Sequence, residues 1–184
     1  ESPSFLVMAS ADPDNAPLQR LQVIKGWIDA NGDPQEQVFD VACANGGGVV
    51  DEPIGRHPSQ RTRQAVSHSG KPAVTHYRLI ERFRAHTHIR VQLETGRTHQ
   101  IRVHMAYIQY PLLGDPTYGG RLRLPKGATA ELIEALRQFK RQALHARKLG
   151  VQHPESGEYC QWESPLPDDF KAMITVLRAD AADA

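Results

Sequence analysis

The polar stretch Gly96-Arg97-Thr98-His99-Gln100-Ile101-Arg102 combines residue types that bind anions. It joins a strand-like run, Ile89 to Leu93, to a helix-like run, Ile101 to Ile108. Thr98 is the expected N-cap, because its hydroxyl can accept a backbone N–H left unpaired in the first turn. Such a helix end favours an anion, so the stretch predicts a phosphate or carboxylate site, with a solvated helix start as the alternative. Four side chains would surround it: Arg97, His99, Gln100 and Arg102.

The charge distribution indicates a polyanionic partner for the middle of the chain. The net charge is only +1, but residues 56–104 carry ten Lys and Arg side chains against Glu81 and Glu94. Nine of the ten are arginine, whose guanidinium both forks onto phosphate and stacks on bases, which favours RNA over a merely solvated face. Outside the helix start, the arginines expected to contact RNA are Arg61, Arg63 and Arg90.

Composition is ordinary for a globular chain. The 184 residues suffice for one domain with a real core, and 40% are hydrophobic and 23% charged. No apolar run reaches membrane-spanning length and no signal pattern opens the chain, so we expect a cytoplasmic protein without a membrane partner. Cys43 and Cys160 are expected to be reduced. His99 and His104 are spaced five apart, which does not align them on one helix face, so we expect no metal. No nucleotide-binding or nucleophile motif is present, so we expect no cofactor.

The apolar pattern predicts an α+β fold with a mixed, mostly antiparallel sheet and flanking helices. Ala73 to Leu79 and Ile89 to Leu93 alternate as two strands linked near Arg84 to Thr87. Thr129 to Arg141 has the period of an amphipathic helix, and a second one is expected around Phe170 to Leu177. A hairpin is expected at the turn 154–157, and residues 56–69 and 110–123 are expected to be loops.

Several segments of the chain, in order, resemble one enzyme family. The strongest is Gly96-Arg97-Thr98-His99-Gln100-Ile101-Arg102-Val103-His104-Met105, which resembles the third sequence motif of the RluA-type RNA pseudouridine synthases, and within them the RluD branch. Others are Val50-Asp51-Glu52-Pro53-Ile54, Lys71-Pro72-Ala73-Val74-Thr75-His76-Tyr77, Pro111-Leu112-Leu113-Gly114-Asp115-Pro116-Thr117-Tyr118-Gly119-Gly120 and Gln142-Ala143-Leu144-His145-Ala146. The resemblance covers residues from about 47 to 184 and implies the C-terminal part of the synthase catalytic domain.

The resemblance implies uridine-to-pseudouridine isomerisation in large-subunit ribosomal RNA, without a cofactor. That reaction needs a carboxylate near C1′ of the nucleotide and a pocket for a base removed from its stack. By resemblance, Arg102 is the arginine that pairs with the catalytic aspartate and keeps it ionised. Tyr118 lies in a family loop and is a further candidate for RNA contact, although a structural turn explains that loop almost as well.

The catalytic aspartate itself is missing from this chain. The family carries it in an Arg-Leu-Asp motif, which occurs nowhere in this sequence. Asp33 or Asp40 would have to take its place. We therefore predict a truncated synthase that is inactive alone, with a non-catalytic RNA-binding remnant as the alternative description of its function.

Residues 1–46 do not resemble a synthase. They look like part of an unrelated, uncharacterised bacterial family, and the glycines Gly46, Gly47 and Gly48 mark the expected junction. Two strand-like runs around Asn31-Gly32-Asp33 predict a β-hairpin in this segment. A reading in which this segment carries the function is disfavoured by its acidity and lack of motifs. The sequence predicts neither the oligomeric state nor the target uridine.

Overall fold

The computed structural model describes residues 20–28, 34–43 and 46–183, with side chains from residue 46 onward. The strands are β1 (Arg20–Ile28), β2 (Pro34–Cys43), β3 (Gly47–Asp51), β4 (Ile54–Arg56), β5 (Gln64–Val66), β6 (Val74–Arg82), β7 (Thr87–Leu93), β8 (Lys148–Gln152) and β9 (Tyr159–Glu163). The helices are α1 (Gln100–Tyr107), α2 (Ala130–Gln138) and α3 (Asp168–Ala182). The α+β prediction is confirmed, and every strand pair in the described part of the chain is antiparallel.

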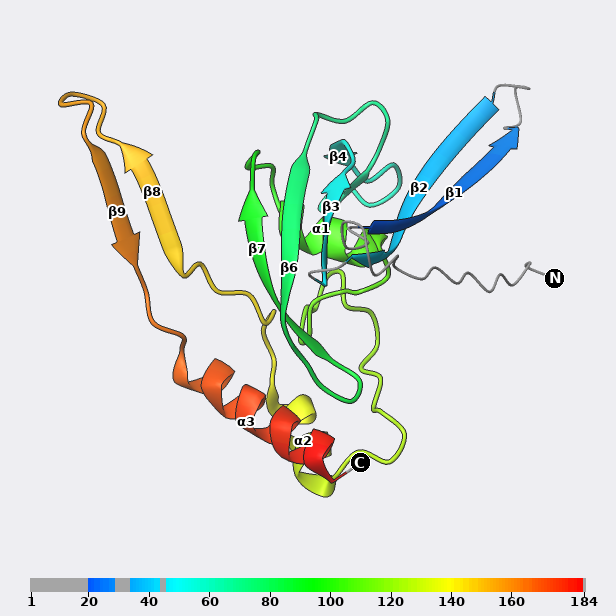
Figure 1. Ribbon diagram of the computed structural model, residues 1–184, viewed down its shortest axis with the longest axis vertical. Coiled ribbons are helices and arrows are strands. Elements are labelled where there is room, and N and C mark those ends of the chain that lie inside the picture. The colour runs from blue at the N-terminus through cyan, green and yellow to red at the C-terminus, as the bar shows by residue number, and fades with distance from the viewer. Residues whose placement is uncertain (1–19, 29–33, 44–45, 184) are drawn as a thin grey trace, which may run out of the picture.

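The central sheet has three strands in the order β3-β6-β7 (Figure 1). Side chains alternate across it, and the face that carries Val50 and Thr75 packs against α1. Val103 of α1 joins Ile54 and Ala73 in a small apolar cluster beneath this face. The predicted strands at 73–79 and 89–93 and the helix at 101–108 therefore form one packed unit around the motif.

The C-terminal helices form a second apolar cluster. Leu132 and Leu136 of α2 lie one turn apart and pack with Phe83, which follows β6. α3 completes the cluster with Met173, Ile174 and Leu177. Thr129 caps α2, since its hydroxyl accepts a hydrogen bond from the backbone N–H of Leu132 at 3.2 Å. Both helices were expected from their apolar period.

Asp180 fastens these helices to the sheet. Its carboxylate accepts from Arg84 Nε at 3.0 Å and Nη2 at 2.5 Å, and from the backbone N–H of Thr129 at 2.8 Å. One side chain of α3 thereby bridges the β6–β7 turn and the start of α2. The carboxylate is almost inaccessible, so this bridge holds the helix pair in place from inside.

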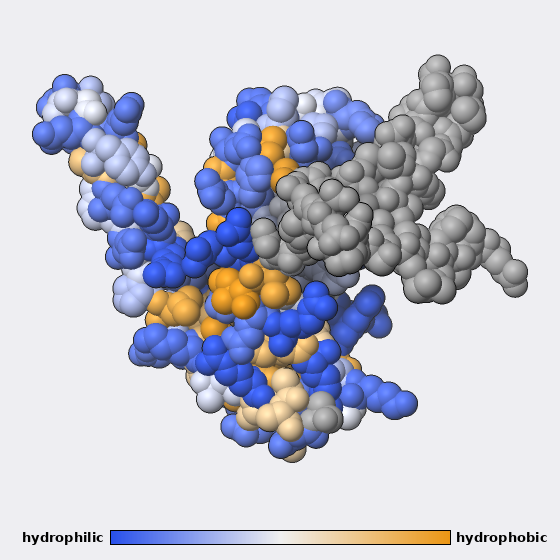
Figure 2. All heavy atoms as spheres, viewed as in Figure 1, coloured by the Kyte–Doolittle hydropathy of each residue, from blue (hydrophilic) through white to orange (hydrophobic). Residues whose placement is uncertain are grey.

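The β8–β9 hairpin extends away from the rest of the chain, as Figure 2 shows. Leu149 and Trp162 face each other across the two strands and are exposed to 64% and 55%. A two-stranded hairpin has little stability of its own in water, so its order depends on the segments that flank it. The turn expected at 154–157 connects its strands.

The N-terminal segment contributes β1 and β2, which pair as the expected hairpin. A register shift between Leu21 and Gln22 interrupts the ladder near its open end. Residues 47–69, by contrast, are built into the unit around α1, because β3 pairs with β6 and Ile54 of β4 lies in its apolar cluster. No helix in the described ranges is both long and apolar enough to cross a membrane.

Candidate functional site

Arg102 and Asp115 form a two-point ion pair at the start of α1. Arg102 Nε lies 2.7 Å from Asp115 Oδ2, and Arg102 Nη2 lies 2.8 Å from Asp115 Oδ1. The Asp115 side chain is fully inaccessible and that of Arg102 is 12% exposed. Burial of both groups makes this pair far less screened than a surface ion pair. The arginine of the motif therefore has its partner thirteen residues downstream, in the loop after α1.

The carboxylate of Asp115 accepts four hydrogen bonds inside the protein. Its Oδ1 also accepts hydrogen bonds from the backbone N–H groups of Thr117 at 2.9 Å and Tyr118 at 3.0 Å. Burial alone would raise the pKa of Asp115, but the hydrogen bonds from Arg102, Tyr118 and Thr117 outweigh it and hold that pKa below its ordinary value. The hydrogen bond from Asp115 in turn raises the pKa of Arg102. Both groups are therefore charged, and Asp115 is a structural anion that folds its loop back onto α1.

One edge of the Arg102 guanidinium remains available. Nε and Nη2 are occupied by Asp115, whereas Nη1 makes no hydrogen bond to any residue in the described part of the chain and is not buried. A phosphate or carboxylate that approaches Arg102 would therefore meet Nη1. The pairing fixes where this nitrogen points, because a guanidinium held at two points cannot rotate.

Tyr118 lies at the centre of a cluster of cations. The guanidinium carbons of Arg63 and Arg102 lie 5.0 Å and 4.9 Å from the centroid of its ring. Its hydroxyl accepts a hydrogen bond from the backbone N–H of Gln64 at 3.0 Å and lies 3.0 Å from His99 Nδ1. Arg63 Nη2 also donates to the backbone carbonyl of Thr117. The structure thus brings together three predicted residues, Arg63, His99 and Tyr118, around Arg102.

The start of α1 differs from the prediction. Thr98 does not cap the helix; the N-cap is His99, in the left-handed region at φ 59° and ψ 20°, and its side chain makes no capping hydrogen bond. Instead, the side chain of Gln100 reaches back to accept from the backbone N–H of Arg97 at 2.9 Å. A non-glycine residue at positive φ is strained, and it is held here by the contacts of its neighbours. The tight turn brings the imidazole of His99 to Tyr118.

Gln100 is buried rather than available to RNA, which corrects its predicted role. The residue is only 2% exposed. Its amide nitrogen donates to the carbonyl of Val74 at 2.9 Å and to the hydroxyl of Thr75 at 3.0 Å. Its amide oxygen accepts from the hydroxyl of Thr95 at 2.8 Å. Every polar atom of the side chain is thus used inside the protein, where it ties α1 to β6.

His104 continues the same buried network. It is fully inaccessible, with Nδ1 2.8 Å from the hydroxyl of Thr75 and Nε2 2.9 Å from the carbonyl oxygen of Glu52. Because a carbonyl only accepts, Nε2 carries the proton and Nδ1 accepts from Thr75. Burial lowers the pKa of His104, so the imidazole is neutral. No group of three or more His, Cys, Asp or Glu in the described ranges is arranged to hold a metal ion.

The remaining residues predicted to contact RNA form no hydrogen bond, ion pair or ring contact with Tyr118 or Arg102 in the described part of the chain. Arg61 and Thr98 are exposed on the segments that carry Arg63 and His99, and Arg97 is half-buried with its Nε donating to the carbonyl of Pro72 at 3.0 Å. Arg90 is exposed on β7 and belongs to the sheet face turned away from α1. Of the two acids considered as replacements, Asp33 lies outside the described residues, and only the backbone of Asp40 is described, in β2.

Comparison with known proteins identifies the lineage of this site. The chain is 59% identical over 140 residues to ribosomal large subunit pseudouridine synthase D of Pseudomonas aeruginosa, a match that covers 76% of this chain and 44% of that protein. It is 61% identical over 134 residues to the protein of the same name from Escherichia coli strain K12, covering 73% and 41%. Over its aligned part, the chain is therefore similar to pseudouridine synthases of the RluD branch. It spans less than half the length of these curated relatives.

A solved structure supports the same fold. Human RNA pseudouridylate synthase domain containing 4 matches with a TM-score of 0.52 and 25% sequence identity, covering 72% of this chain and 56% of that one. The pseudouridine synthase fold predicted from the motifs is therefore confirmed. Within this fold, Asp115 and Tyr118 both contact Arg102 of the motif.

The N-terminal region matches a different family model, described as a protein of unknown function (DUF3604), over residues 1–69. This agrees with the expectation that the chain opens with sequence from an uncharacterised family. The match runs past the expected junction at residue 46. A 69-residue match and a 140-residue match cannot both fit in 184 residues without sharing part of the sequence, so the two regions overlap.

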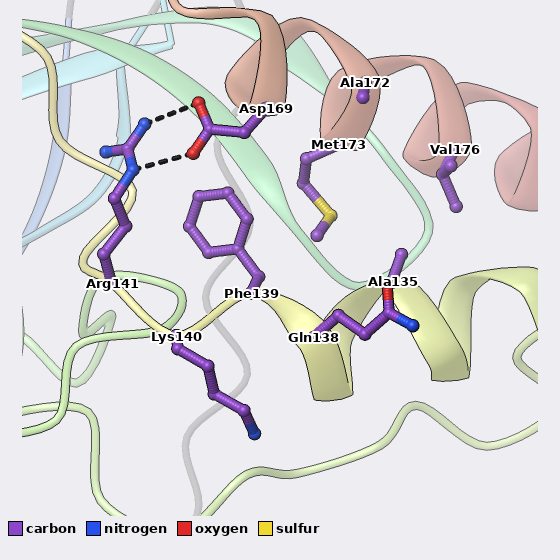
Figure 3. A pocket seen from close by; sticks show the side chains of 9 residues that line it. All are labelled: Ala135, Gln138, Phe139, Lys140, Arg141, Asp169, Ala172, Met173 and Val176. Atoms are coloured by element: carbon purple, nitrogen blue, oxygen red, sulfur yellow. Dashed lines mark hydrogen bonds and ion pairs between the residues drawn. The ribbon is translucent and has the colours of Figure 1, made fainter.

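A hollow of about 530 Å³ lies between α2 and α3, and neither Arg102 nor Asp115 lines it (Figure 3). Phe139 and Met173 form its apolar wall, and the ion pair between Arg141 and Asp169 closes one end. The two side chains of the pair are exposed to 39% and 48%, and no residue predicted to act in catalysis or RNA binding lines the hollow.

Proposed function

We propose that this chain is an RNA-binding segment of a pseudouridine synthase lineage whose reaction is uridine isomerisation in large-subunit ribosomal RNA, and that alone it binds RNA without isomerising it. The identity of about 60% to proteins named ribosomal large subunit pseudouridine synthase D supports the lineage. The aligned region spans 44% of the relative from Pseudomonas aeruginosa, so the rest of that protein has no counterpart in the alignment. A cytoplasmic location follows from this proposal, because ribosomal RNA is the substrate it names.

The ion pair of Arg102 with Asp115 carries the proposal. Isomerisation requires a carboxylate that can reach C1′ of the target uridine. Asp115 cannot serve, because its side chain is inaccessible and its oxygens already accept four hydrogen bonds, two from Arg102 and two from backbone N–H groups. Within residues 46–183, Asp115 is the acid paired with Arg102. Asp115 thus holds Arg102 in place, but a catalytic acid that Arg102 could orient through Nη1 would have to come from outside residues 46–183.

The surface around Tyr118 supports RNA binding. Arg63 and Arg102 lie over its ring, His99 contacts its hydroxyl, and Arg61 is exposed on the same loop as Arg63. Cationic and aromatic groups together suit a nucleotide, since the cations contact phosphate and the planar groups stack on an unpaired base. We assign RNA contacts to Arg61, Arg63, Arg97, Thr98, His99 and Tyr118.

We also propose a division of the chain at about residue 46. Residues 1–46 form the foreign or divergent segment with the β1–β2 hairpin, and residues 47–184 form the partial synthase domain. The pairing of β3 with β6 supports this placement, because it ties residues 47–51 to the motif-bearing unit.

RNA binding is tested by fluorescence anisotropy with a labelled uridine-containing RNA stem-loop. The salt concentration is varied between about 50 and 200 mM, a range over which affinity that depends on phosphate contacts falls strongly. We expect affinity that falls steeply with salt and Arg61→Gln to weaken it by about threefold to tenfold. Arg137→Gln removes an equally exposed arginine from α2, and it should leave the affinity unchanged. Absence of binding, or binding insensitive to salt and to Arg61→Gln, would contradict the proposal.

A further inference from the structure

The central sheet has one face that α1 does not cover. Thr75 of β6 is buried against α1, where its hydroxyl contacts Gln100 and His104. Side chains alternate along a strand, so Arg78, three residues further on, points to the opposite face. Arg78 is exposed. Arg78 therefore presents its cationic side chain on the face of the sheet opposite α1, because Thr75 is buried on the other face.

Arg78 stands directly opposite a second arginine. In the antiparallel register of β6 and β7, Arg78 pairs with Arg90, and both side chains are exposed. On its other side Arg78 faces Gly47 of β3, which has no side chain to shield it. Like charges directly opposite each other in a sheet are destabilising. An anion bound between the two guanidinium groups would offset the repulsion between them.

The nearby carboxylates of the described residues do not neutralise this pair. Glu81 accepts from Arg178 Nε at 2.8 Å and Nη2 at 2.7 Å. Glu94 lies 2.5 Å from His76 Nε2. Asp51 stands opposite Val74, four residues along β6 from Arg78, at the far end of β3. Each acid is therefore either engaged with another side chain or displaced along the strand.

We propose that Arg78 and Arg90 form a second RNA-contacting surface, which grips a backbone phosphate on the sheet face opposite α1. The inference rests on the proposed function, because it takes RNA as the partner. Two guanidinium forks side by side match the oxygens of a phosphate, and the negative charge removes the repulsion between them. RNA would then contact the chain at two places, the Tyr118 cluster and this face of the sheet.

The test compares Arg78→Gln, Arg90→Gln and the double variant with the wild-type chain, using the same labelled RNA stem-loop and with Arg137→Gln as the control. We expect each single variant to weaken binding about threefold to tenfold and to lower the salt slope of the affinity by about 0.7 to 0.9. Thermal unfolding should show the opposite trend, with Arg78→Gln raising the midpoint by about 1–3 °C, because it removes the like-charge pair. A loss of affinity combined with a gain in stability separates a binding role from a structural one.

The outcomes distinguish this inference from the function on which it rests. If Arg61→Gln weakens RNA binding but Arg78→Gln and Arg90→Gln leave both affinity and salt slope unchanged, the second surface is wrong and the proposed function stands. If the wild-type chain does not bind the RNA, both fail. Binding of inorganic phosphate alone that is lost in the double variant, without any change in RNA affinity, would also overturn the inference.

Discussion

Arg102 is held by Asp115 through two hydrogen bonds of 2.7 and 2.8 Å, in a pair whose acid is completely inaccessible to solvent. The pair connects the first turn of α1 to the loop that follows the helix. It also fixes the orientation of Arg102, since it occupies Nε and Nη2 and leaves Nη1 without a hydrogen bond to the described residues. The structural and functional roles of the arginine are thus assigned to different nitrogens of one guanidinium.

Asp115→Asn should destabilise the chain by about 3–5 kcal/mol, because it leaves the guanidinium of Arg102 largely buried without its counter-charge. Urea denaturation followed by circular dichroism measures the loss. Asp169→Asn is the matched control, because it breaks a two-point pair with Arg141 that is exposed to solvent and should cost little. Equal losses in the two variants would show that burial does not strengthen the Arg102 pair.

His104 should make stability depend on pH. Its pKa in the folded chain is lowered by burial from an ordinary value of 6.5, so the unfolded chain takes up a proton that the folded chain does not. Stability is therefore complete above about pH 6.5 and falls as the pH drops toward the folded pKa. His104→Gln should reduce this slope by at most about 1.4 kcal/mol per pH unit.

His68→Gln provides the control for that measurement, because it removes an exposed histidine instead of the buried one. The measurement is the free energy of unfolding in urea between about pH 5 and 7. A slope unaltered by His104→Gln would mean that the buried imidazole takes up its proton equally in both states.

The left-handed backbone of His99 predicts an unusual order of stability. Both His99→Gly and His99→Ala remove the imidazole and its contact with Tyr118, so their difference reports the backbone. Glycine adopts φ 59° without strain, whereas alanine does not, and His99→Gly should be more stable by about 1 kcal/mol. At an ordinary helical position the order is reversed. Thermal unfolding of the two variants decides between these orders.

The sequence predicts well those parts of the fold whose pattern is local. The period of Leu132 and Leu136 predicts α2, and alternation predicts β6, β7 and the β8–β9 hairpin. These features depend on neighbours within one or two turns. Residue pattern is sufficient there because the buried face of each element repeats along the chain.

The local geometry of the site could not be predicted in the same way. Asp115 lies thirteen residues from Arg102, and only the folding of the intervening loop brings the two together. Gln100 has the polarity of a surface residue but satisfies every polar atom in a buried network, which no local pattern reveals. Thr98 has the residue type of a cap, yet the left-handed turn at His99 takes that position.

Tritium release from RNA that carries 5-tritiated uridine, measured with the purified chain and with its Arg102→Ala variant, tests most directly whether the chain isomerises uridine. We expect no release above the level of the Arg102→Ala variant, while salt-sensitive RNA binding is retained. Release that disappears in Arg102→Ala would contradict this expectation, and would mean that a carboxylate such as Asp33 or Asp40 reaches the arginine and completes the site.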